Sequence, residues 1–285
     1  MTGFGINTMV SHASKLGNIE RWNVTEMINW ANSFPRATLM DTSAGQMMNI
    51  MVFMVLDKFV DWSTGNVTFN SDEFIEILEF AATFGNTDEW NPDRIPTYEA
   101  LTTGQNLMMT HTIMDLTYMQ LIDALFDGEA RFIGYPSETG SGILMTQTGA
   151  AGINSRSNNK DGAFAFINYL MSDAYQSSEN RGVIPIKRSA IDEMIRAKTP
   201  GPGQDMVPMG YDDFFDMFDL ARNRDYVDRF NDLISRASGI MIYDEQMNNI
   251  IMEETGSVFA GQKSARDAAE IIQNRIQLYV NENRN

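Results

Sequence analysis

Apolar residues recur at helical spacing in several stretches of the chain, and most of these stretches begin with a residue that can cap a helix. Asn23 is followed by Glu26 at the spacing of a capping box, and Asn70 is followed by Glu73 in the same way. The same pattern predicts helices over residues 46–60, 116–125 and 159–172, and helices that begin at the caps Asp244 and Ser264. The chain is therefore predicted to be rich in helix.

Short apolar runs between these helices predict strands. Residues 4–10, 107–110 and 131–136 have the length and composition of strands, and residues 143–153 and 183–186 are extended and interrupted by glycine or proline. Residues 87–97 and 199–210 are rich in Pro, Gly, Asp and Asn, which is typical of loops. Strands that alternate with helices indicate an α/β fold.

Composition limits the classes of protein that this chain can belong to. It has 285 residues, 43% of them hydrophobic and 21% charged, which suits one large core or two lobes. No stretch reaches the roughly 20 apolar residues of a membrane helix. The formal charge of −17 leaves no basic face for nucleic acid. Residues 1–6 lack the features of a signal peptide, so any signal sequence is expected to have been lost from this chain.

The inventory of reactive side chains argues against most catalytic chemistry. The absence of cysteine removes thiol catalysis and thiolate zinc sites. The two histidines, His12 and His111, stand far apart, and no Gly-x-Ser-x-Gly sequence accompanies them. We expect two surface or hydrogen-bonded histidines, with no metal site and no cofactor.

Three weaker patterns have simpler explanations. Residues 61–66 faintly resemble a calcium loop, but Asn66 occupies the position that needs glycine, so a turn is favoured. The glycines of residues 140–152 lack the strand-then-helix context of a dinucleotide site and fit a hinge better. The paired carboxylates at residues 212–213 and 253–254 leave a carbohydrate-active hydrolase as the alternative function.

Six segments together resemble the extracellular solute-binding proteins, sugar-type family 1, of ATP-binding cassette importers. Their order along the chain is more specific than any single motif. They are residues 22–26 (Trp-Asn-Val-Thr-Glu), 59–65 (Phe-Val-Asp-Trp-Ser-Thr-Gly), 101–109 (Leu-x-x-Gly-x-x-Leu-Met-Met), 132–136 (Phe-Ile-Gly-Tyr-Pro), 159–167 (Asn-Lys-Asp-Gly-Ala-Phe-Ala-Phe-Ile) and 259–264 (Phe-Ala-Gly-Gln-Lys-Ser).

The resemblance implies a helix-rich, periplasmic-binding-protein-like fold of type II. Residues 1–142 and 184–285 would form an essentially complete C-terminal lobe, and residues 143–183 would be a crossover segment of an otherwise absent N-terminal lobe. The chain is then expected to be a truncation, with residues 143–183 projecting from the main lobe.

The function that the resemblance implies is binding rather than catalysis. A sugar or oligosaccharide would be captured between two lobes and delivered to a membrane permease, with the full-length protein extracellular and held at the membrane by a signal or lipid anchor. The solute would shift an open–closed equilibrium towards the closed form. A scaffold or adhesion module with an acidic surface is a further alternative.

Candidate ligand-binding residues follow from the resemblance and from the chemistry of sugars. Open α/β sheets place ligands beyond the carboxyl ends of strands, and the strand predicted over residues 107–110 is followed by hydroxyl, imidazole and carboxylate groups. Aromatic rings near loop ends can stack on sugar C–H faces, although each can equally pack against its own helix. The candidates are Trp62, Thr110, His111, Thr112, Asp115 and Tyr243.

Overall fold

A computed structural model describes residues 1–84, 97–138, 140–178, 181–198, 226–241 and 243–284. It separates into two compact units. The first contains Met1–Asn18, Met108–Gly134 and Gly140–Ile240, and the second contains Ile19–Leu107, Tyr135–Thr139 and Met241–Asn285. The predicted loop 199–210 lies outside the described residues, and so does all of 87–97 except Thr97.

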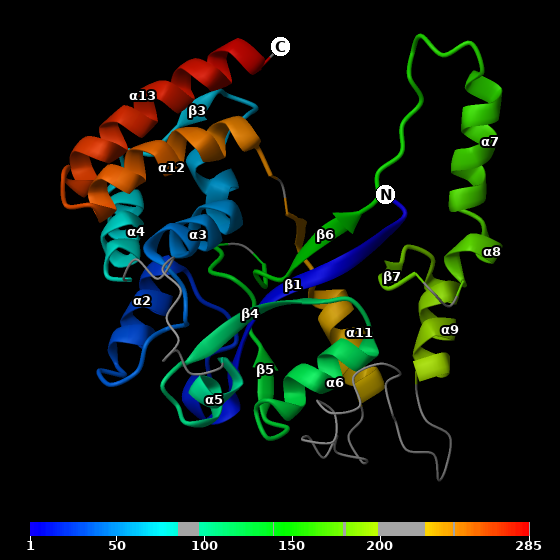
Figure 1. The fold of residues 1–285 in the computed structure, drawn as a ribbon, viewed down its shortest axis with the longest axis horizontal. Helices are drawn as coiled ribbons and strands as arrows, with labels where there is room; N and C mark the ends of the chain where they lie inside the picture. Colours follow the sequence, from blue (N-terminus) through cyan, green and yellow to red (C-terminus); the bar gives the residue numbers. More distant parts are fainter. Residues whose placement is uncertain (85–96, 139, 179–180, 199–225, 242, 285) are drawn as a thin grey trace. The chain divides into compact units, whose positions relative to one another are not determined.

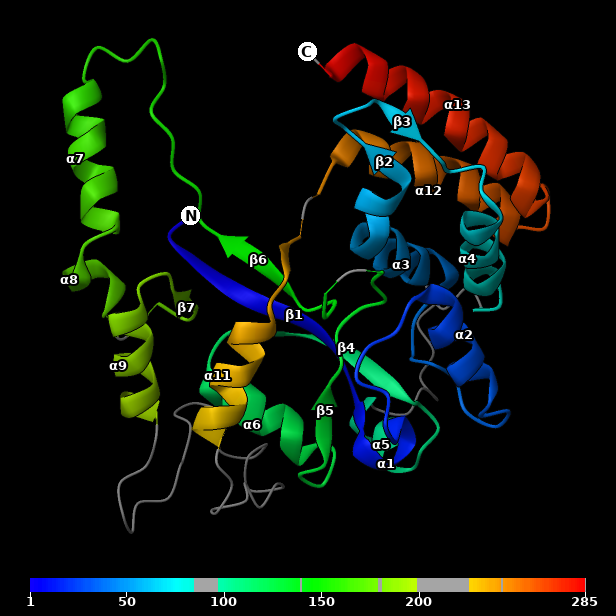
Figure 2. The ribbon, with the colours of Figure 1, turned by 180° about the vertical axis from the view of Figure 1, so that it is seen from behind.

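The first unit is built on a mixed sheet. Its described strands are β1 (Gly3–His12), β4 (Met108–Ile113), β5 (Ala130–Phe132), β6 (Leu144–Thr148), β7 (Ile184–Pro185) and β8 (Gly239–Ile240). The sheet order is β4-β1-β6-β8, and β5 and β7 also pair with β1 (Figures 1 and 2). Every pairing of β1 is antiparallel, whereas β6 and β8 run parallel.

Strand β1 is the centre of this sheet. Its residues from Gly3 to Ser11 are all buried, so both of its faces are covered. Ile6, Met9 and Val10 are fully buried, and Phe4 is 6% exposed. A strand paired along both edges and covered on both faces has a nearly continuous buried pattern. The strand predicted over residues 4–10 is confirmed, and it extends further at both ends.

Most helices of the first unit pack against the sheet or against one another, and α7 packs mainly against α8. They are α1 (Ala13–Leu16), α6 (Leu116–Ala124), α7 (Lys160–Leu170), α8 (Asp173–Gln176), α9 (Arg188–Lys198) and α11 (Tyr226–Arg236). Asp123 of α6 is fully buried. Its carboxylate accepts hydrogen bonds from both Nη atoms of Arg229 at 3.0 and 3.1 Å. It also accepts hydrogen bonds from the Tyr226 hydroxyl at 2.9 Å and from the Ala130 amide at 3.0 Å. These bonds satisfy the buried carboxylate and fix α11 to α6.

The second unit is helical, with one short hairpin. Its described elements are α2 (Val24–Asn32), α3 (Ala44–Phe59), β2 (Val60–Asp61), β3 (Asn66–Val67), α4 (Asp72–Ala82), α5 (Thr97–Thr102), α12 (Glu245–Phe259) and α13 (Ala265–Asn283). Phe59, Phe69 and Phe74 form its aromatic centre, with ring centroids 4.9 to 5.4 Å apart. Methionines of α2 and α3 (Met27, Met47, Met48 and Met51) are also buried in this unit, and their flexible side chains suit an irregular core.

Most of the predicted helix starts are confirmed, because capping is a local interaction. Asn23 and Glu26 form the capping box, and Asn159, Asp244 and Ser264 cap α7, α12 and α13. The start predicted at Asn70 was wrong by one residue, because Ser71 accepts the Phe74 amide and caps α4. None of the helices in the described residues is both long enough and apolar enough to span a lipid bilayer.

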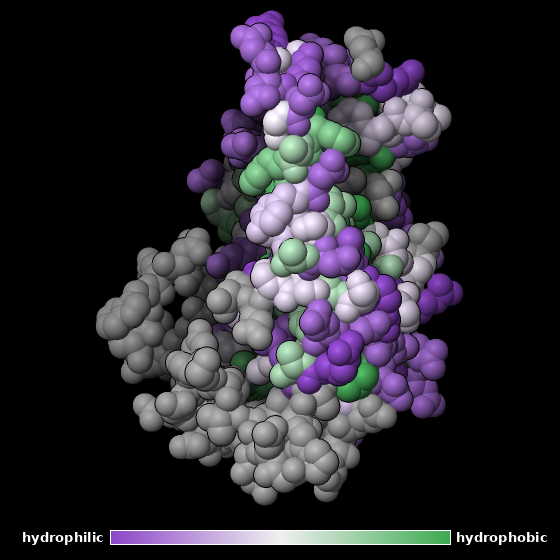
Figure 3. All heavy atoms as spheres, turned by 90° about the vertical axis from the view of Figure 1, so that its right-hand side faces the viewer, coloured by the Kyte–Doolittle hydropathy of each residue, from purple (hydrophilic) through white to green (hydrophobic). Residues whose placement is uncertain are grey.

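Helix α7 forms as predicted but leaves its aromatic side chains exposed to solvent. Phe164 is 57% exposed and Tyr169 54%, Met171 just beyond the helix is 40% exposed, and no residue of α7 is buried. Its main packing partner in the described residues is α8. Figure 3 views the side of the molecule that carries α7 and shows apolar surface between polar residues. We refer below to Phe164 and Met171, seven residues apart, as the α7 stripe.

Candidate functional site

Polar side chains cross the sheet of the first unit on one face of three neighbouring strands. The register pairs Asn7 of β1 with Thr112 of β4, and Gly5 with Thr146 of β6. The Thr112 hydroxyl donates to the Asn7 Oδ1 atom, and the Asn7 amide donates to the Thr146 hydroxyl. Asn7 is 6% exposed, while Thr112 and Thr146 are half-buried. A hydroxyl, an amide and a second hydroxyl therefore form a hydrogen-bonded row, which we call the Asn7 row.

The strand that carries Thr112 is longer than predicted. The strand was predicted to span residues 107–110, but β4 continues to Ile113. It continues because β1 pairs with it over six residues, from Ser11 opposite Met108 to Ile6 opposite Ile113. His111 and Thr112 therefore lie within the strand and not beyond its end. Successive strand residues point to opposite faces, so Thr110 and Thr112 share the face of Asn7 and His111 lies on the other.

His111 pairs with Thr8 of β1, and its side chain lies on the face of the sheet opposite Asn7. Its ring lies 6.0 Å from the Tyr118 ring of α6. The Nε2 atom is buried and has no hydrogen-bond partner among the described residues. Burial lowers the pKa of His111, because the charged imidazolium would lose its water. The imidazole is therefore neutral at neutral pH and sits apart from the Asn7 row.

Asp115 already has partners for both of its carboxylate oxygens. It caps α6 by accepting the Tyr118 amide at 3.1 Å, and it pairs with Lys198 of α9 at 2.8 Å. Its side chain is 9% exposed. Asp115 therefore holds two helices in the first unit, and any contact with a ligand would be added to that structural role.

The two aromatic candidates, Trp62 and Tyr243, belong to the second unit, and each contacts a different residue there. The Trp62 and Tyr279 ring centroids are 6.4 Å apart with nearly perpendicular planes, and the Tyr279 hydroxyl donates to Asp244 at 3.0 Å. Asn248 donates to the Tyr243 hydroxyl at 3.3 Å. The structure thus gathers Trp62 and Tyr243 in one unit, and Thr110, Thr112, His111 and Asp115 in the other.

The sequence analysis did not select several residues of these two groups as candidates. Asn7 lay inside a predicted strand, and an amide in a mostly apolar strand is a signal that could have been used. Tyr279 lies in the helix predicted to begin at Ser264, where it follows Ile272 and Ile276 at the spacing of a core residue. Lys198 and Thr146 had no distinguishing pattern, because only the tertiary structure brings them beside Asp115 and Asn7.

The other chemical patterns in the sequence have structural explanations. Asp61 accepts the Ser63 and Thr64 hydroxyls and amides, and these hydrogen bonds lower its pKa, as expected for a turn. His12 caps α1 through its Nδ1 atom. The described residues contain no group of three or more His, Asp or Glu side chains arranged to hold a metal ion.

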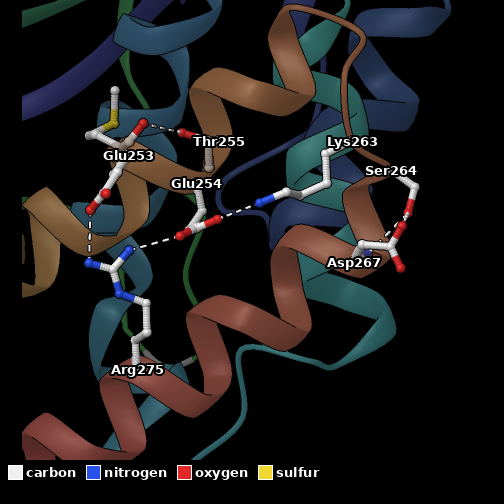
Figure 4. Close-up of polar contacts among 8 residues, drawn as sticks. Glu253, Glu254, Thr255, Lys263, Ser264, Asp267 and Arg275 are labelled. Atoms are coloured by element: carbon white, nitrogen blue, oxygen red, sulfur yellow. Dashed lines mark hydrogen bonds and ion pairs between the residues drawn. The ribbon is translucent and has the colours of Figure 1, made fainter.

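The adjacent carboxylates of α12 are engaged in ion pairs (Figure 4). Arg275 of α13 donates to Glu253 and Glu254 at 2.8 Å, and Lys263 donates to Glu254 at 2.6 Å. Hydrogen bonding to Lys263 and Arg275 lowers the pKa of Glu254. Glu254 therefore stays ionised and holds α12 to α13. Asp212 and Asp213, the other carboxylate pair of the hydrolase alternative, lie outside the described residues.

Comparisons with known proteins show the fold. No protein-family model matches the chain, and no curated protein matches it. Among solved structures, the sugar-binding protein MalE of Xanthomonas citri matches 99% of this chain and 70% of its own, with a TM-score of 0.58 and 14% identity. A putative oligosaccharide periplasmic-binding protein of Synechococcus sp. MITs9220 gives a TM-score of 0.57 at 12% identity, over 98% and 73% of the two chains.

Maltose-bound MalE3 of T. maritima is similar to the same extent, with a TM-score of 0.53 at 14% identity over 97% of this chain and 71% of its own. The helix-rich, periplasmic-binding-protein-like α/β fold predicted from the sequence is therefore confirmed. Because the match covers nearly all of this chain, both units belong to that fold.

Proposed function

We propose that this chain is the solute-binding component of an ATP-binding cassette importer, which captures a sugar or oligosaccharide and delivers it to a membrane permease. The observation that carries the proposal is the likeness over 97–99% of the chain to proteins whose names describe sugar-binding or oligosaccharide-binding proteins. We propose binding rather than catalysis, because the described carboxylates of the hydrolase alternative, Glu253 and Glu254, are occupied by Arg275 and Lys263.

The exposed α7 stripe supports the proposed division into lobes. Residues 1–142 and 184–285 would form the C-terminal lobe, and residues 143–183 would cross into an N-terminal lobe that this chain lacks. The similar solved chains are longer, since the match covers only 70–73% of each. Solvent-exposed apolar side chains on a regular helix are what the loss of a packing partner would leave. The full-length protein would then be extracellular and anchored at the membrane.

The proposed ligand contacts are Thr110, His111, Thr112 and Asp115 in the first unit, and Trp62 and Tyr243 in the second. Hydroxyls and amides of the Asn7 row offer donors and acceptors that match sugar hydroxyls. Exposed rings offer faces for stacking on sugar C–H groups. Closure of two lobes on the solute would be stabilised by these contacts and recognised by the permease.

Saturation-transfer NMR tests sugar binding, because it detects weak complexes and the isolated chain is expected to bind weakly. The probes are four neutral disaccharides: maltose, cellobiose, xylobiose and diacetylchitobiose. We expect saturation transfer to at least one of them. Thr112→Val should weaken that binding about fivefold by removing a hydroxyl of the Asn7 row, at a cost of about 1 kcal/mol. Thr117→Val on α6 is the control. Absence of transfer to all four sugars would contradict the proposed function.

Asp115 requires a different substitution. Asp115→Ala removes the cap of α6, worth about 1 kcal/mol, and leaves Lys198 without its partner, so we expect a lower melting temperature as well as any loss of binding. Asp115→Asn retains an oxygen that accepts the Tyr118 amide. If a folded Asp115→Asn variant binds sugar with unchanged affinity, the charge of the Asp115 carboxylate does not contribute to binding.

A further inference from the structure

His111 places a titratable ring between the sheet and a helix of the first unit. It lies in the middle of β4, and the main elements packed against that strand are β1 and α6. The ring lies 6.0 Å from the Tyr118 ring of α6, and its Nε2 atom is buried without a hydrogen-bond partner among the described residues. Such a position suits a neutral imidazole better than an imidazolium, because the charged ring needs acceptors or water.

The two strands offer the ring no charged partner. Thr8 stands directly opposite His111, and its hydroxyl already donates to a backbone carbonyl at 3.0 Å and accepts a backbone amide at 3.1 Å. The diagonal neighbours on the same face are Ile6 and Val10, which are both fully buried. His12, four residues beyond Thr8, is the only other titratable side chain in β1 and β4. An imidazolium would therefore meet no carboxylate from either strand.

Helix α6 carries carboxylates, but each is paired with a cation from another helix. Asp115, the cap of α6, pairs with Lys198 of α9 at 2.8 Å. Asp123, near the other end of the helix, is fully buried and pairs with Arg229 of α11 at 3.0 Å. Tyr118 is the remaining titratable side chain of α6. Burial therefore decides the charge of the imidazole, and it lowers the pKa of the ring below the ordinary value of 6.5.

The linkage between protonation and folding gives the direction of the effect. The unfolded chain binds a proton at His111 near the ordinary pKa of 6.5, whereas the folded chain binds it only at lower pH. The neutral ring therefore contributes its full stability above pH 6.5, and this contribution is lost as the pH falls from that value through the folded pKa. Protonation in the folded chain requires the ring, or the helix that covers it, to move until water reaches the charge.

We propose that His111 is a pH-sensitive switch, in which the neutral ring holds α6 against β4 and protonation loosens that contact. The switch goes beyond the proposed function, because it needs no ligand. Helix α6 begins directly after Asp115, one of the proposed ligand contacts, so the same event would reach the candidate site. All the groups involved belong to the first unit, so the switch can be tested in the chain as it stands.

Urea unfolding of the whole chain at about pH 7.5 and about pH 5 tests the switch. His111→Phe keeps a ring beside Tyr118 but cannot be protonated, and His111→Gln keeps a polar side chain. Because the carboxylates contribute equally to every chain, we expect the parent to lose more stability between the two pH values than either variant. His12→Asn is the control, since asparagine can still cap α1, and it should behave like the parent. Equal losses in the parent and in both His111 variants would overturn the proposal.

Two measurements on the parent chain decide the question even if a His111 variant fails to fold. The chain has only two histidines, so its NMR spectrum contains two imidazole signals, which His12→Asn assigns. We expect the His111 signal to titrate below pH 6.5, and the α6 amides to lose protection against hydrogen exchange over the same range while the α4 amides keep theirs. A His111 signal that titrates at or above pH 6.5, or α6 amides that stay protected in acid, would contradict the switch.

Discussion

Helices α4 and α7 have the same length and the same kind of beginning, yet their apolar side chains have opposite surroundings. Each spans 11 residues and starts with a side chain that accepts the amide three positions later: Ser71 accepts Phe74 and Asn159 accepts Gly162. In α4, Phe74, Ile77 and Leu78 are fully buried. In α7 no residue is buried.

The difference lies in the neighbours that each helix finds. Helix α4 packs against α2, α3, α12 and α13 of its own unit, whereas the main partner of α7 among the described residues is the four-residue helix α8. Capping and apolar spacing determine that a helix forms and which face is apolar, but not whether anything covers that face. An apolar stripe therefore does not show by itself what covers it, and no residue of α7 is buried in the described part of the chain.

The largest expected difference in stability between the two helices comes from removing one aromatic ring from each of them. Phe74→Ala should lower the free energy of unfolding by about 3–5 kcal/mol, because it leaves a cavity between Phe59 and Phe69. Phe164→Ala should change it by less than about 0.5 kcal/mol, because Phe164 is 57% exposed. Urea unfolding at low protein concentration, followed by circular dichroism, measures both. Similar losses in the two variants would show that α7 is packed as tightly as α4.

A second prediction concerns association between chains. The α7 stripe should make the isolated chain self-associate, since exposed apolar surface favours contacts that bury it. Phe164→Ser combined with Met171→Ser should weaken self-association about tenfold or more in light scattering. The matched control is Ile271→Ser with Leu278→Ser on α13, two residues with the same spacing that are 36% and 60% exposed. A monomeric parent chain, or equal effects of both pairs, would contradict the prediction.

The same contrast explains which features the sequence could predict. Helix starts at Asn23, Asp244 and Ser264 were predicted correctly, because a cap is made by residues three positions apart. The end of β4 was not, because Ile113 is held in the strand by Ile6, a residue remote in the sequence. Local chemistry is readable along the chain, whereas strand length depends on the partner strand.

The candidate site shows the same limit more strongly. The sequence selected Thr110, His111 and Thr112 together, but the extension of β4 places His111 on the opposite face. Asp115 was chosen for its carboxylate, and nothing in the sequence showed that Lys198 pairs with it. Tyr279 was indistinguishable from a core residue until the fold brought it beside Trp62.

The smallest expected effect on stability comes from removing the N-terminal cap of each helix. Ser71→Ala should cost about 1 kcal/mol of global stability, because α4 unfolds together with the core that it helps to form. Asn159→Ala removes an equivalent bond, made at 3.1 Å to the Gly162 amide. Because α7 buries no side chain, its first turn can open without the rest of the unit, so the midpoint of urea unfolding should stay unchanged while hydrogen exchange of the α7 amides accelerates about fivefold. Ser71→Thr and Asn159→Asp keep an acceptor and should restore both properties. An equal fall in global stability for the two alanine variants would mean that α7 is coupled to the core, and the contrast between the helices would then be one of exposure only.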